Sequence, residues 1–387
     1  MMLKPLRVLH VASFHGNIGD NANHLGFRPW FQNQLGHLVE WTSLEIREFY
    51  WNERQWDDSF IATANAHDVV IIGGGNYFEL WVENSPTGTS VAITPETFAK
   101  INVPVFFNAL GVDPGQGVPD VSLARFKGFL NTLLADQRFL VSVRNDGAHG
   151  NLRHYVGEEY AGRVHRVPDG GFFVPPQVAA SKQADAYRLG INIASDMPEF
   201  RFRGFASDDG IQGFVREFAS VIEKLLQTCP DTEIVLFPHI FRDLEIISLL
   251  INHLPDRLRR TQLSVASYGS GDRAALETLA IYASCDLVLA MRFHANVCPI
   301  GMGIQTLGLD CYPQIANLYK ELNQDERAID VSHPGFVEPL FDASLNALTA
   351  PEKFQSSPAE AIRTVELLRE SFEPVFKSWL DQNDLIN

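Results

Sequence analysis

CDLVLAMRFHANVCPIGMGIQTLGL, residues 285–309, is the stretch that decides the fold. Its apolar run Leu287–Ala290 is typical of a parallel strand covered on both faces, and Ala295–Met302 is typical of a short helix that ends at Gly303. Arg292 and His294 fall between the two, at the carboxyl end of the strand and the start of the helix. Open α/β sheets bind ligands at this edge, and the unpaired N–H groups of a helix start favour anions. The stretch therefore predicts an α/β fold with an anion site.

The pair Arg292 and His294 has two interpretations. An arginine offers a permanent charge and a forked donor for carboxylate or phosphate, and a histidine can carry a proton at neutral pH. Together they favour a site where an anionic substrate undergoes proton-dependent chemistry. The local sequence is equally consistent with a buried arginine paired to a carboxylate and a histidine that caps a loop.

The composition limits the class of protein. At 387 residues the chain is long enough for two domains, and its 45% hydrophobic and 20% charged residues are ordinary for a globular protein. A net charge of −16 argues against nucleic acid or anionic lipid as partners, so any anion must be held by a local cationic pocket. The four cysteines show no CxxC or zinc spacing, which predicts reduced thiols and no metal site. No signal peptide is evident and no run approaches about 18 apolar residues, so we expect a cytoplasmic protein without a transmembrane segment.

A polar turn lies near the N-terminus. Arg7–Ala12 is a candidate strand, Asn23–Leu35 has helical spacing, and the residues between them, FHGNIGDNA, suit a tight turn. Asn17 and Asp20 in this turn could hydrogen-bond a sugar or orient a substrate hydroxyl. Asp20 is also suited to cap the helix, and the two roles are compatible.

A glycine-rich strand end follows at residues 67–76, HDVVIIGGGN. Gly74, Gly75 and Asn76 close this strand and would let a ligand approach the backbone. The segment does not match GxGxxG, and no acidic residue at the expected spacing marks a ribose site, so a dinucleotide-binding function is not indicated.

Strand and helix patterns alternate through the rest of the chain. The further strand candidates are 104–110, 138–144 and 164–167 in the first half and 188–194, 233–237 and 262–266 in the second. Paired prolines and small polar residues at 174–185 predict a linker. We therefore predict an α/β protein with two Rossmann-like, doubly wound parallel-sheet domains facing a cleft, at 1–178 and 185–350. A C-terminal helix within 357–387 is expected to cross back to the N-terminal domain.

Other charged side chains end strands or lie in loops on the predicted binding edge. Arg144 ends a first-half strand, and His239 and Asp243 follow strand 233–237. Arg201 and Arg203 lie in a polar loop of the second half, where they are either anion clamps or solvated loop charges.

Read together, these segments resemble the polysaccharide pyruvyl transferase family over roughly residues 10–330. The order and spacing of five short motifs carry the resemblance, because each motif alone is weak. They are the NxGD-type turn Asn17–Asp20, the strand end Gly73–Gly75, the G-x-G loop in Leu110–Gly117, the Arg-led turn Val143–Asp146 and the Arg-x-His motif Arg292–His294.

The resemblance implies a glycosyltransferase-B-like fold with an acceptor-side N-terminal domain and a donor-side C-terminal domain. It implies transfer of pyruvyl from phosphoenolpyruvate to two hydroxyls of one sugar, which forms a cyclic ketal and releases phosphate. It assigns Arg292 and His294 to the phosphoenolpyruvate site, and Lys320 in PQIANLYKEL to a supporting role. Two departures bear on donor binding: RNDGAH keeps only the arginine of its motif, Arg144, and NIASD lacks an arginine that Arg201 or Arg203 would have to replace.

The mechanism that we predict needs no metal and no cofactor besides the donor. Arg292 would neutralise the donor anion and His294 would deliver a proton to its methylene carbon. Asp20 is the first candidate for the base that activates the acceptor hydroxyl, followed by His239 or Asp243.

Two other functions fit the same pattern. One is a nucleotide-sugar-dependent glycosyltransferase of the same fold, in which Arg292 grips a diphosphate, and the other is a catalytically silent sugar- or anion-binding protein. The expected partners are a small-molecule donor and a saccharide acceptor, with or without a lipid carrier, in polysaccharide or exopolysaccharide biosynthesis. The sequence leaves self-association into a homo-oligomer open.

Overall fold

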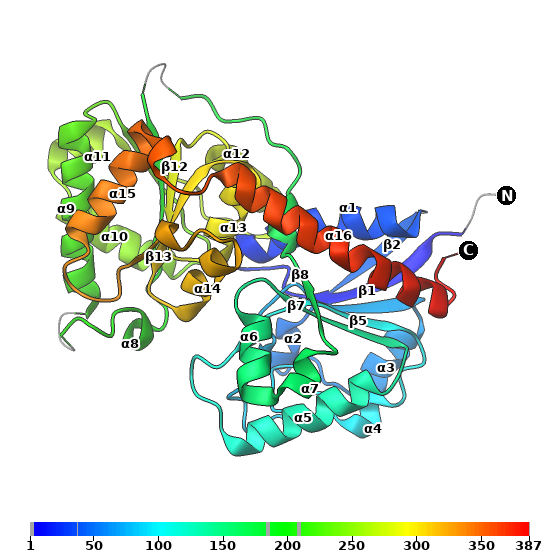
Figure 1. Cartoon of the computed structure of the whole chain (residues 1–387). Helices are drawn as coiled ribbons and strands as arrows, with labels where there is room; N and C mark the ends of the chain where they lie inside the picture. Colours follow the sequence, from blue (N-terminus) through cyan, green and yellow to red (C-terminus); the bar gives the residue numbers. More distant parts are fainter. Residues whose placement is uncertain (1–3, 37, 183–185, 207–209, 387) are drawn as a thin grey trace. The chain divides into compact units, whose positions relative to one another are not determined.

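The computed structural model of the chain describes residues 4–36, 38–182, 186–206 and 210–386. The chain forms two compact units (Figure 1). The first unit consists of Met1–Phe14, Gly26–Gly170 and Glu366–Asn387, and the second of His15–Leu25 and Gly171–Val365. Two helices, α1 (Ile18–Leu35) and α16 (Pro358–Gln382), therefore contribute residues to both units.

A six-stranded parallel sheet with the order β2-β1-β3-β5-β7-β8 forms the centre of the first unit. Its strands are β1 (Leu6–Ala12), β2 (Val39–Glu45), β3 (Val69–Gly73), β5 (Val105–Leu110), β7 (Phe139–Arg144) and β8 (His165–Val167). A small parallel pair accompanies it, β4 (Phe78–Glu79) with β6 (Val112–Asp113). The helices are α2 (Arg47–Tyr50), α3 (Asp58–Asn65), α4 (Pro95–Phe98), α5 (Asp120–Leu134), α6 (Ala148–Asn151) and α7 (Glu158–Ala161), with short η1 (Leu152–Val156) and η2 (Gly170–Phe173).

Both faces of this sheet are covered, as the apolar strands require. Alternate strand residues enter different hydrophobic clusters: Leu9 packs with the α3 and α5 side, and Val8 packs with α1 and the end of α16. Phe372 and Phe376 of α16 are buried against Phe106 of β5, with ring centroids 6.0 and 5.3 Å apart. The sheet is thus sandwiched between two apolar layers of helices.

The second unit is built on another six-stranded parallel sheet, with the order β11-β10-β9-β12-β13-β14. Its strands are β9 (Arg188–Asn192), β10 (Glu233–Leu236), β11 (Leu263–Val265), β12 (Leu287–Ala290), β13 (Gln305–Asp310) and β14 (Ala328–Asp330). The helices are α8 (Pro198–Arg201), α9 (Gly210–Thr228), α10 (Asp243–His253), α11 (Asp256–Thr261), α12 (Gly271–Tyr282), α13 (Phe293–Gly301), α14 (Pro313–Glu321) and α15 (Val337–Thr349), with short η3 (Asp325–Arg327) and η4 (Pro351–Lys353).

The structure confirms the predicted fold class, because each unit has a doubly wound parallel sheet. Strand β12 covers the predicted residues and is fully buried, and α13 ends before Gly303, whose φ of 79° suits a glycine after a helix end. The first helix, in contrast, begins at Ile18 and not at Asn23. Within the described residues no helix is both long and apolar enough to cross a membrane.

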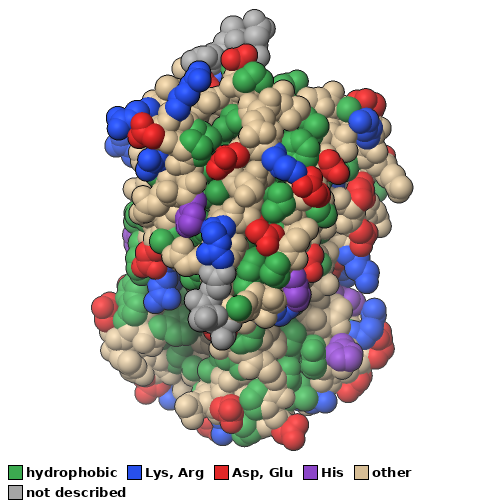
Figure 2. Space-filling model, turned by 90° about the vertical axis from the view of Figure 1, so that its left-hand side faces the viewer, with side chains coloured by type: hydrophobic (Ala, Val, Ile, Leu, Met, Phe, Trp, Pro, Cys, Tyr) green, Lys and Arg blue, Asp and Glu red, His purple; other side chains and the backbone are tan. Residues whose placement is uncertain are grey.

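On the face drawn in Figure 2, basic and acidic side chains are interspersed. This distribution agrees with a chain that holds 31 Lys and Arg against 47 Asp and Glu. A face on which both signs are mixed gives no extended field that would attract a polyanion.

Candidate active site

Arg292 lies at the point where the strand order of the second sheet reverses. Counted from one to six, strands β9 to β14 run in the order 3-2-1-4-5-6, so the reversal falls between β9 and β12. Open α/β sheets bind ligands at the carboxyl ends of the strands at this point. Arg292 is the N-cap residue of α13, and its backbone N–H donates to the side chain of Asn192 at the end of β9 (3.0 Å). The arginine is thus anchored to both central strands.

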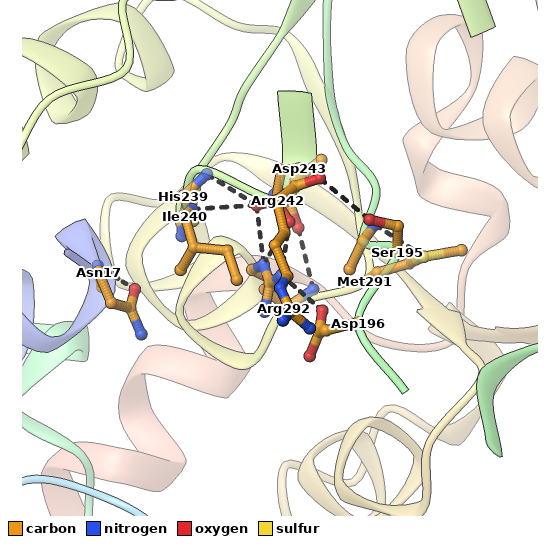
Figure 3. A network of polar contacts seen from close by, with 12 residues as sticks. Asn17, Ser195, Asp196, His239, Ile240, Arg242, Asp243, Met291 and Arg292 are labelled. Carbon is orange, nitrogen blue, oxygen red and sulfur yellow. Dashed lines mark hydrogen bonds and ion pairs between the residues drawn. The ribbon is translucent and has the colours of Figure 1, made fainter. Parts of the chain in front are cut away.

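Two carboxylates hold the Arg292 guanidinium (Figure 3). Its Nε donates to both oxygens of Asp243 (2.8 and 3.1 Å), and its Nη2 donates to Asp196 (2.6 Å) and to Asp243. The side chain of Arg292 is 13% exposed and that of Asp243 is fully buried. Burial acts to lower the pKa of Arg292, but the hydrogen bonds and charges of the two carboxylates outweigh it and raise this pKa. The structure therefore has the second arrangement that the sequence allowed, a buried arginine paired to carboxylates.

Asp243 also fixes the loop that follows β10. Its Oδ2 accepts the backbone N–H groups of His239 (2.9 Å) and Ile240 (3.2 Å), as Figure 3 shows. One buried carboxylate therefore orders both this loop and the guanidinium. Its oxygens are committed to these donors, which makes Asp243 a poor candidate for a catalytic base.

Asp196 connects Arg292 to a second buried arginine. The Nη2 atom of Arg201 lies 3.3 Å from Oδ2 of Asp196, and its Nε donates to the Asp196 carbonyl (2.9 Å). The remaining Nη1 of Arg201 contacts Sγ of Cys311 (3.4 Å). Burial acts to raise the pKa of Asp196, but the charges of Arg201 and Arg292 outweigh it and lower this pKa, so the group is ionised at neutral pH.

The other two predicted cations of this unit are placed differently. Arg203 is exposed and lies near Asp310 and Asp330, at the ends of β13 and β14. Burial, together with the charge of Asp330, raises the pKa of Asp310 to about 6, and Arg203 opposes this shift. Lys320 is exposed on α14.

His294 is buried in the first turn of α13 and packs against Gly19. A Cβ added at Gly19 would lie 2.6 Å from both Cβ and Nδ1 of the histidine. Only a glycine fits at this position, because Cβ of His294 is fixed to the backbone of α13 and cannot rotate away. The contact joins the N-terminal turn to the Arg-x-His motif, because His294 lies 275 residues after Gly19 in the chain.

The N-terminal turn is capped by Asn17 and not by Asp20. Oδ1 of Asn17 accepts the N–H of Gly19 (3.0 Å), and Asp20 lies buried in the first turn of α1. The alternative role of Asp20 as the cap is therefore wrong, although its charge still suits the positive end of the helix. The N–H of Ile18 donates to the His239 carbonyl (3.3 Å), so the turn, His239 and His294 lie together.

His239 is fully surrounded by protein. Its Nε2 lies 2.8 Å from the Tyr282 hydroxyl, and its backbone N–H donates to Asp243, which also holds Arg292 (Figure 3). Burial, with the nearby charges of Arg292 and His294, lowers the pKa of His239 well below its ordinary value. The imidazole is thus neutral at pH 7, which is the form that can accept a proton.

The other predicted residues belong to the first unit. Arg144 is buried, donates from Nε to Asp146 (2.6 Å) and lies 3.8 Å from Asp169. Gly74 has a φ of 84°, and a Cβ at Gly75 would lie 2.4 Å from the ring of a neighbouring tyrosine, so the backbone here requires glycine for its own packing.

Asn76 belongs to a polar cluster that the sequence did not reveal. Its Nδ2 donates to Asp113 (2.9 Å), which stands opposite Glu79 in the register of the β4–β6 pair. Burial, with the charge of Asp113, raises the pKa of Glu79 to about 8. Only the pairing of these two short strands brings the carboxyl groups together.

Asp196 is the other functional candidate that the sequence analysis missed. The NIASD segment lacks the arginine of the family pattern, and the carboxylate at its end is Asp196, which the structure places against Arg292. Its position directly after a central strand was the available signal. Within the described residues, no group of three or more His, Cys, Asp or Glu side chains is arranged to hold a metal ion.

One comparison identifies the family, and a comparison with solved structures identifies the fold. The family model for polysaccharide pyruvyl transferase matches residues 13–311. A putative UDP-N-acetylglucosamine 2-epimerase from Listeria monocytogenes has a TM-score of 0.53 at 9% identity, covering 94% of this chain and 91% of its own. A glycosyltransferase from Rickettsia africae has a TM-score of 0.53 at 9% identity, with 98% and 99% covered. An Anabaena protein in complex with UDP and glucose has a TM-score of 0.51 at 11% identity, with 98% and 99% covered. A search of curated proteins finds no match.

Proposed function

The chain belongs to the polysaccharide pyruvyl transferase family, and on this premise we propose that it transfers pyruvyl from phosphoenolpyruvate to two hydroxyls of one sugar. In the first step a sugar hydroxyl adds to C2 of the donor while C3 takes up a proton. In the second step another hydroxyl of the sugar displaces phosphate from C2, which closes the ketal. The fold and the family support a transferase, and the donor is the part that we propose.

The observation that carries the proposal is the position of Arg292 and His294 at the start of α13, on the switch point of the second sheet. Two buried guanidiniums, those of Arg292 and Arg201, lie within reach of one carboxylate there. Together with the helix start they suit a ligand that bears both a carboxylate and a phosphate.

We assign the proton donated to C3 to His294 and the removal of the hydroxyl proton to Asp20 or His239. His239 is neutral at pH 7, but the burial and charges that lower its pKa also make it a weak base, so Asp20 remains the first candidate. Asp20 lies one residue from Gly19, against which His294 packs. No cofactor besides the donor enters this scheme.

A nucleotide-sugar-dependent glycosyltransferase is the second candidate. Its support is the likeness to the Anabaena protein that holds UDP and glucose, which shows the fold that the two share. In this scheme the Arg292 site would grip a diphosphate. For either function we propose a cytoplasmic enzyme of polysaccharide or exopolysaccharide biosynthesis whose saccharide acceptor is free or carried on a lipid.

A thermal-shift comparison separates these functions. Stabilisation by phosphoenolpyruvate but not by UDP-sugars supports pyruvyl transfer, and the reverse supports glycosyl transfer. A panel of saccharide acceptors is then incubated with phosphoenolpyruvate, and phosphate release and the acceptor mass are measured. Donor binding without phosphate release on any acceptor would favour a catalytically silent binding protein.

A further inference from the structure

We propose that the Asp196 carboxylate is an internal ligand of the Arg292 and Arg201 guanidiniums, and that an anionic substrate binds by displacing it. The proposal rests on the proposed function in placing an anionic donor at these arginines. It adds a residue that sets which anions the site accepts.

The geometry of Asp196 is that of a bound ligand. One of its carboxylate oxygens accepts from Nη2 of Arg292 (2.6 Å) and the other lies 3.3 Å from Nη2 of Arg201. A carboxylate whose two oxygens bridge two guanidiniums occupies the position in which a substrate carboxylate or phosphate would be recognised. As long as Asp196 stays there, these two donors are not available to a substrate.

Asp196 and Asp243 differ in what else they hold. The side chain of Asp243 is fully buried and orders the backbone of the β10 loop through two N–H groups. The side chain of Asp196 is 20% exposed, and its hydrogen bonds described above go to the two guanidiniums. Displacing Asp196 would therefore leave the loop and the Arg292–Asp243 pair in place.

The backbone next to Asp196 supports its exchange. Met197 has φ 54° and ψ 52°, the left-handed conformation that is uncommon for residues other than glycine. Such strain persists only where the surroundings impose it, and it is concentrated at ligand sites and switch regions.

The charges predict which ligands can compete. Two guanidiniums and two carboxylates, those of Asp196 and Asp243, sum to zero. A monoanion such as pyruvate would only replace one carboxylate by another of equal charge. Phosphoenolpyruvate and inorganic phosphate carry more negative charge at neutral pH, so each has an electrostatic advantage over Asp196. After transfer, the return of Asp196 would help to release phosphate.

The test is an Asp196→Asn variant titrated calorimetrically with phosphoenolpyruvate, inorganic phosphate and pyruvate. In the variant no carboxylate competes for the two guanidiniums, and one unit-charge attraction at about 4 Å is worth about fivefold in affinity even at the dielectric constant of water, and more in a buried site. We therefore expect at least about fivefold tighter binding of all three anions. Asp256→Asn is the matched control, because it removes the same charge from the exposed start of α11 and should leave affinity unchanged.

Unchanged or weaker binding of inorganic phosphate by a folded Asp196→Asn protein would overturn the proposal. Circular dichroism checks the fold, and Asp196→Ser provides a smaller neutral variant with the same expectation. The titrations distinguish a failure of this proposal from a failure of the proposed pyruvyl transfer. Tighter phosphate binding in the variant, with phosphoenolpyruvate bound no better than phosphate by the wild type, would support the internal ligand and contradict the donor. Turnover of phosphoenolpyruvate by the wild type, with no gain of anion affinity in the variants, would support the donor and contradict the internal ligand.

Discussion

Replacing Asp243 with asparagine tests whether this buried carboxylate holds the site together. The Asp243 carboxylate accepts hydrogen bonds from Nε and Nη2 of Arg292 and from the backbone N–H groups of two loop residues, and its side chain is fully buried. Removing one partner of a buried ion pair typically costs about 3–5 kcal/mol. Asparagine keeps one acceptor oxygen and Asp196 still contacts the arginine, so we expect a loss near the lower end, about 3 kcal/mol of the free energy of unfolding.

The distribution of tryptophans makes this measurement specific. All six lie in the first unit: Trp30, Trp41, Trp51, Trp56, Trp81 and Trp379. Tryptophan fluorescence therefore follows unfolding of that unit, whereas far-UV circular dichroism follows both. With a urea dependence of about 2 kcal/mol per molar, a loss of about 3 kcal/mol should lower the midpoint of the dichroism transition by about 1.5 M, and the fluorescence midpoint shows whether the first unit unfolds with it. Asp256→Asn, a change of the same charge on the surface, should move neither signal.

A loss below about 1 kcal/mol for Asp243→Asn would refute the reasoning, since that is the range of exposed ion pairs. A double-mutant cycle with Arg292→Met gives a second check. Removing the guanidinium as well leaves no unpaired buried charge, so the double variant should be less destabilised than the sum of the single variants by about 1–3 kcal/mol. Simple additivity would mean that the two side chains do not interact.

Four further changes have definite expected outcomes. His294→Ala should keep the fold by circular dichroism and lower ketal formation from phosphoenolpyruvate by about 10²-fold or more; turnover close to that of the wild type would contradict the acid role. Arg292→Lys should raise the dissociation constant for phosphoenolpyruvate, because an ammonium group cannot reproduce the two parallel hydrogen bonds of a guanidinium. An unchanged dissociation constant in calorimetry would count against a donor-binding role for Arg292. Gly19→Ala should lower both stability and turnover, because its Cβ would lie 2.6 Å from Cβ of His294 and the start of α13 would have to shift; an unaltered rate would show that the position of the His294 ring does not matter. For Glu79, whose pKa is raised to about 8, the unfolded chain loses its proton above the ordinary pKa of 4.5 while the folded chain keeps it. The free energy of unfolding should therefore decrease as the pH rises from 4.5 to 8, by at most about 1.4 kcal/mol per pH unit. Urea titrations at pH 5 and pH 8 should show this decrease in the wild type and not in Glu79→Gln. The same decrease in both proteins would argue against the raised pKa.

The fold could be predicted because the sequences of buried parallel strands are continuous apolar runs. Strand β12, LVLA, is such a run, and so is β3, VVIIG. Strand β2, VEWTSLE, lacks such a run, because it alternates polar and apolar residues and is partly exposed, as an edge strand is. The predicted start of α1 is five residues too late, since Gly19 and three polar residues obscure the helical pattern that begins after the Asn17 cap.

The pairing of charges in the site could not be predicted from the sequence. Strand ends place Arg292 on the binding edge, but its carboxylate partners Asp243 and Asp196 are 49 and 96 residues away in the chain. Which acids reach the guanidinium depends on strand order and loop conformation. The contact between Gly19 and His294 has the same origin, because it requires residues 15–25 to join the second unit.

The two interpretations of Arg292 are compatible once the ligand-free protein is considered. Two buried guanidiniums without counter-charges would each cost several kcal/mol, and a chain with a net charge of −16 has ample carboxylates to supply them. A site that must hold a multiply charged anion is therefore stable without its ligand only if acidic side chains take the ligand's place. Asp243 supplies one such counter-charge permanently, because it also orders a loop. Asp196 supplies the other from a partly exposed position, where a ligand can replace it. Pairing of a buried arginine with a carboxylate thus does not distinguish a structural arginine from a ligand-binding one. The distinction depends on how exposed that carboxylate is and on which other groups it binds.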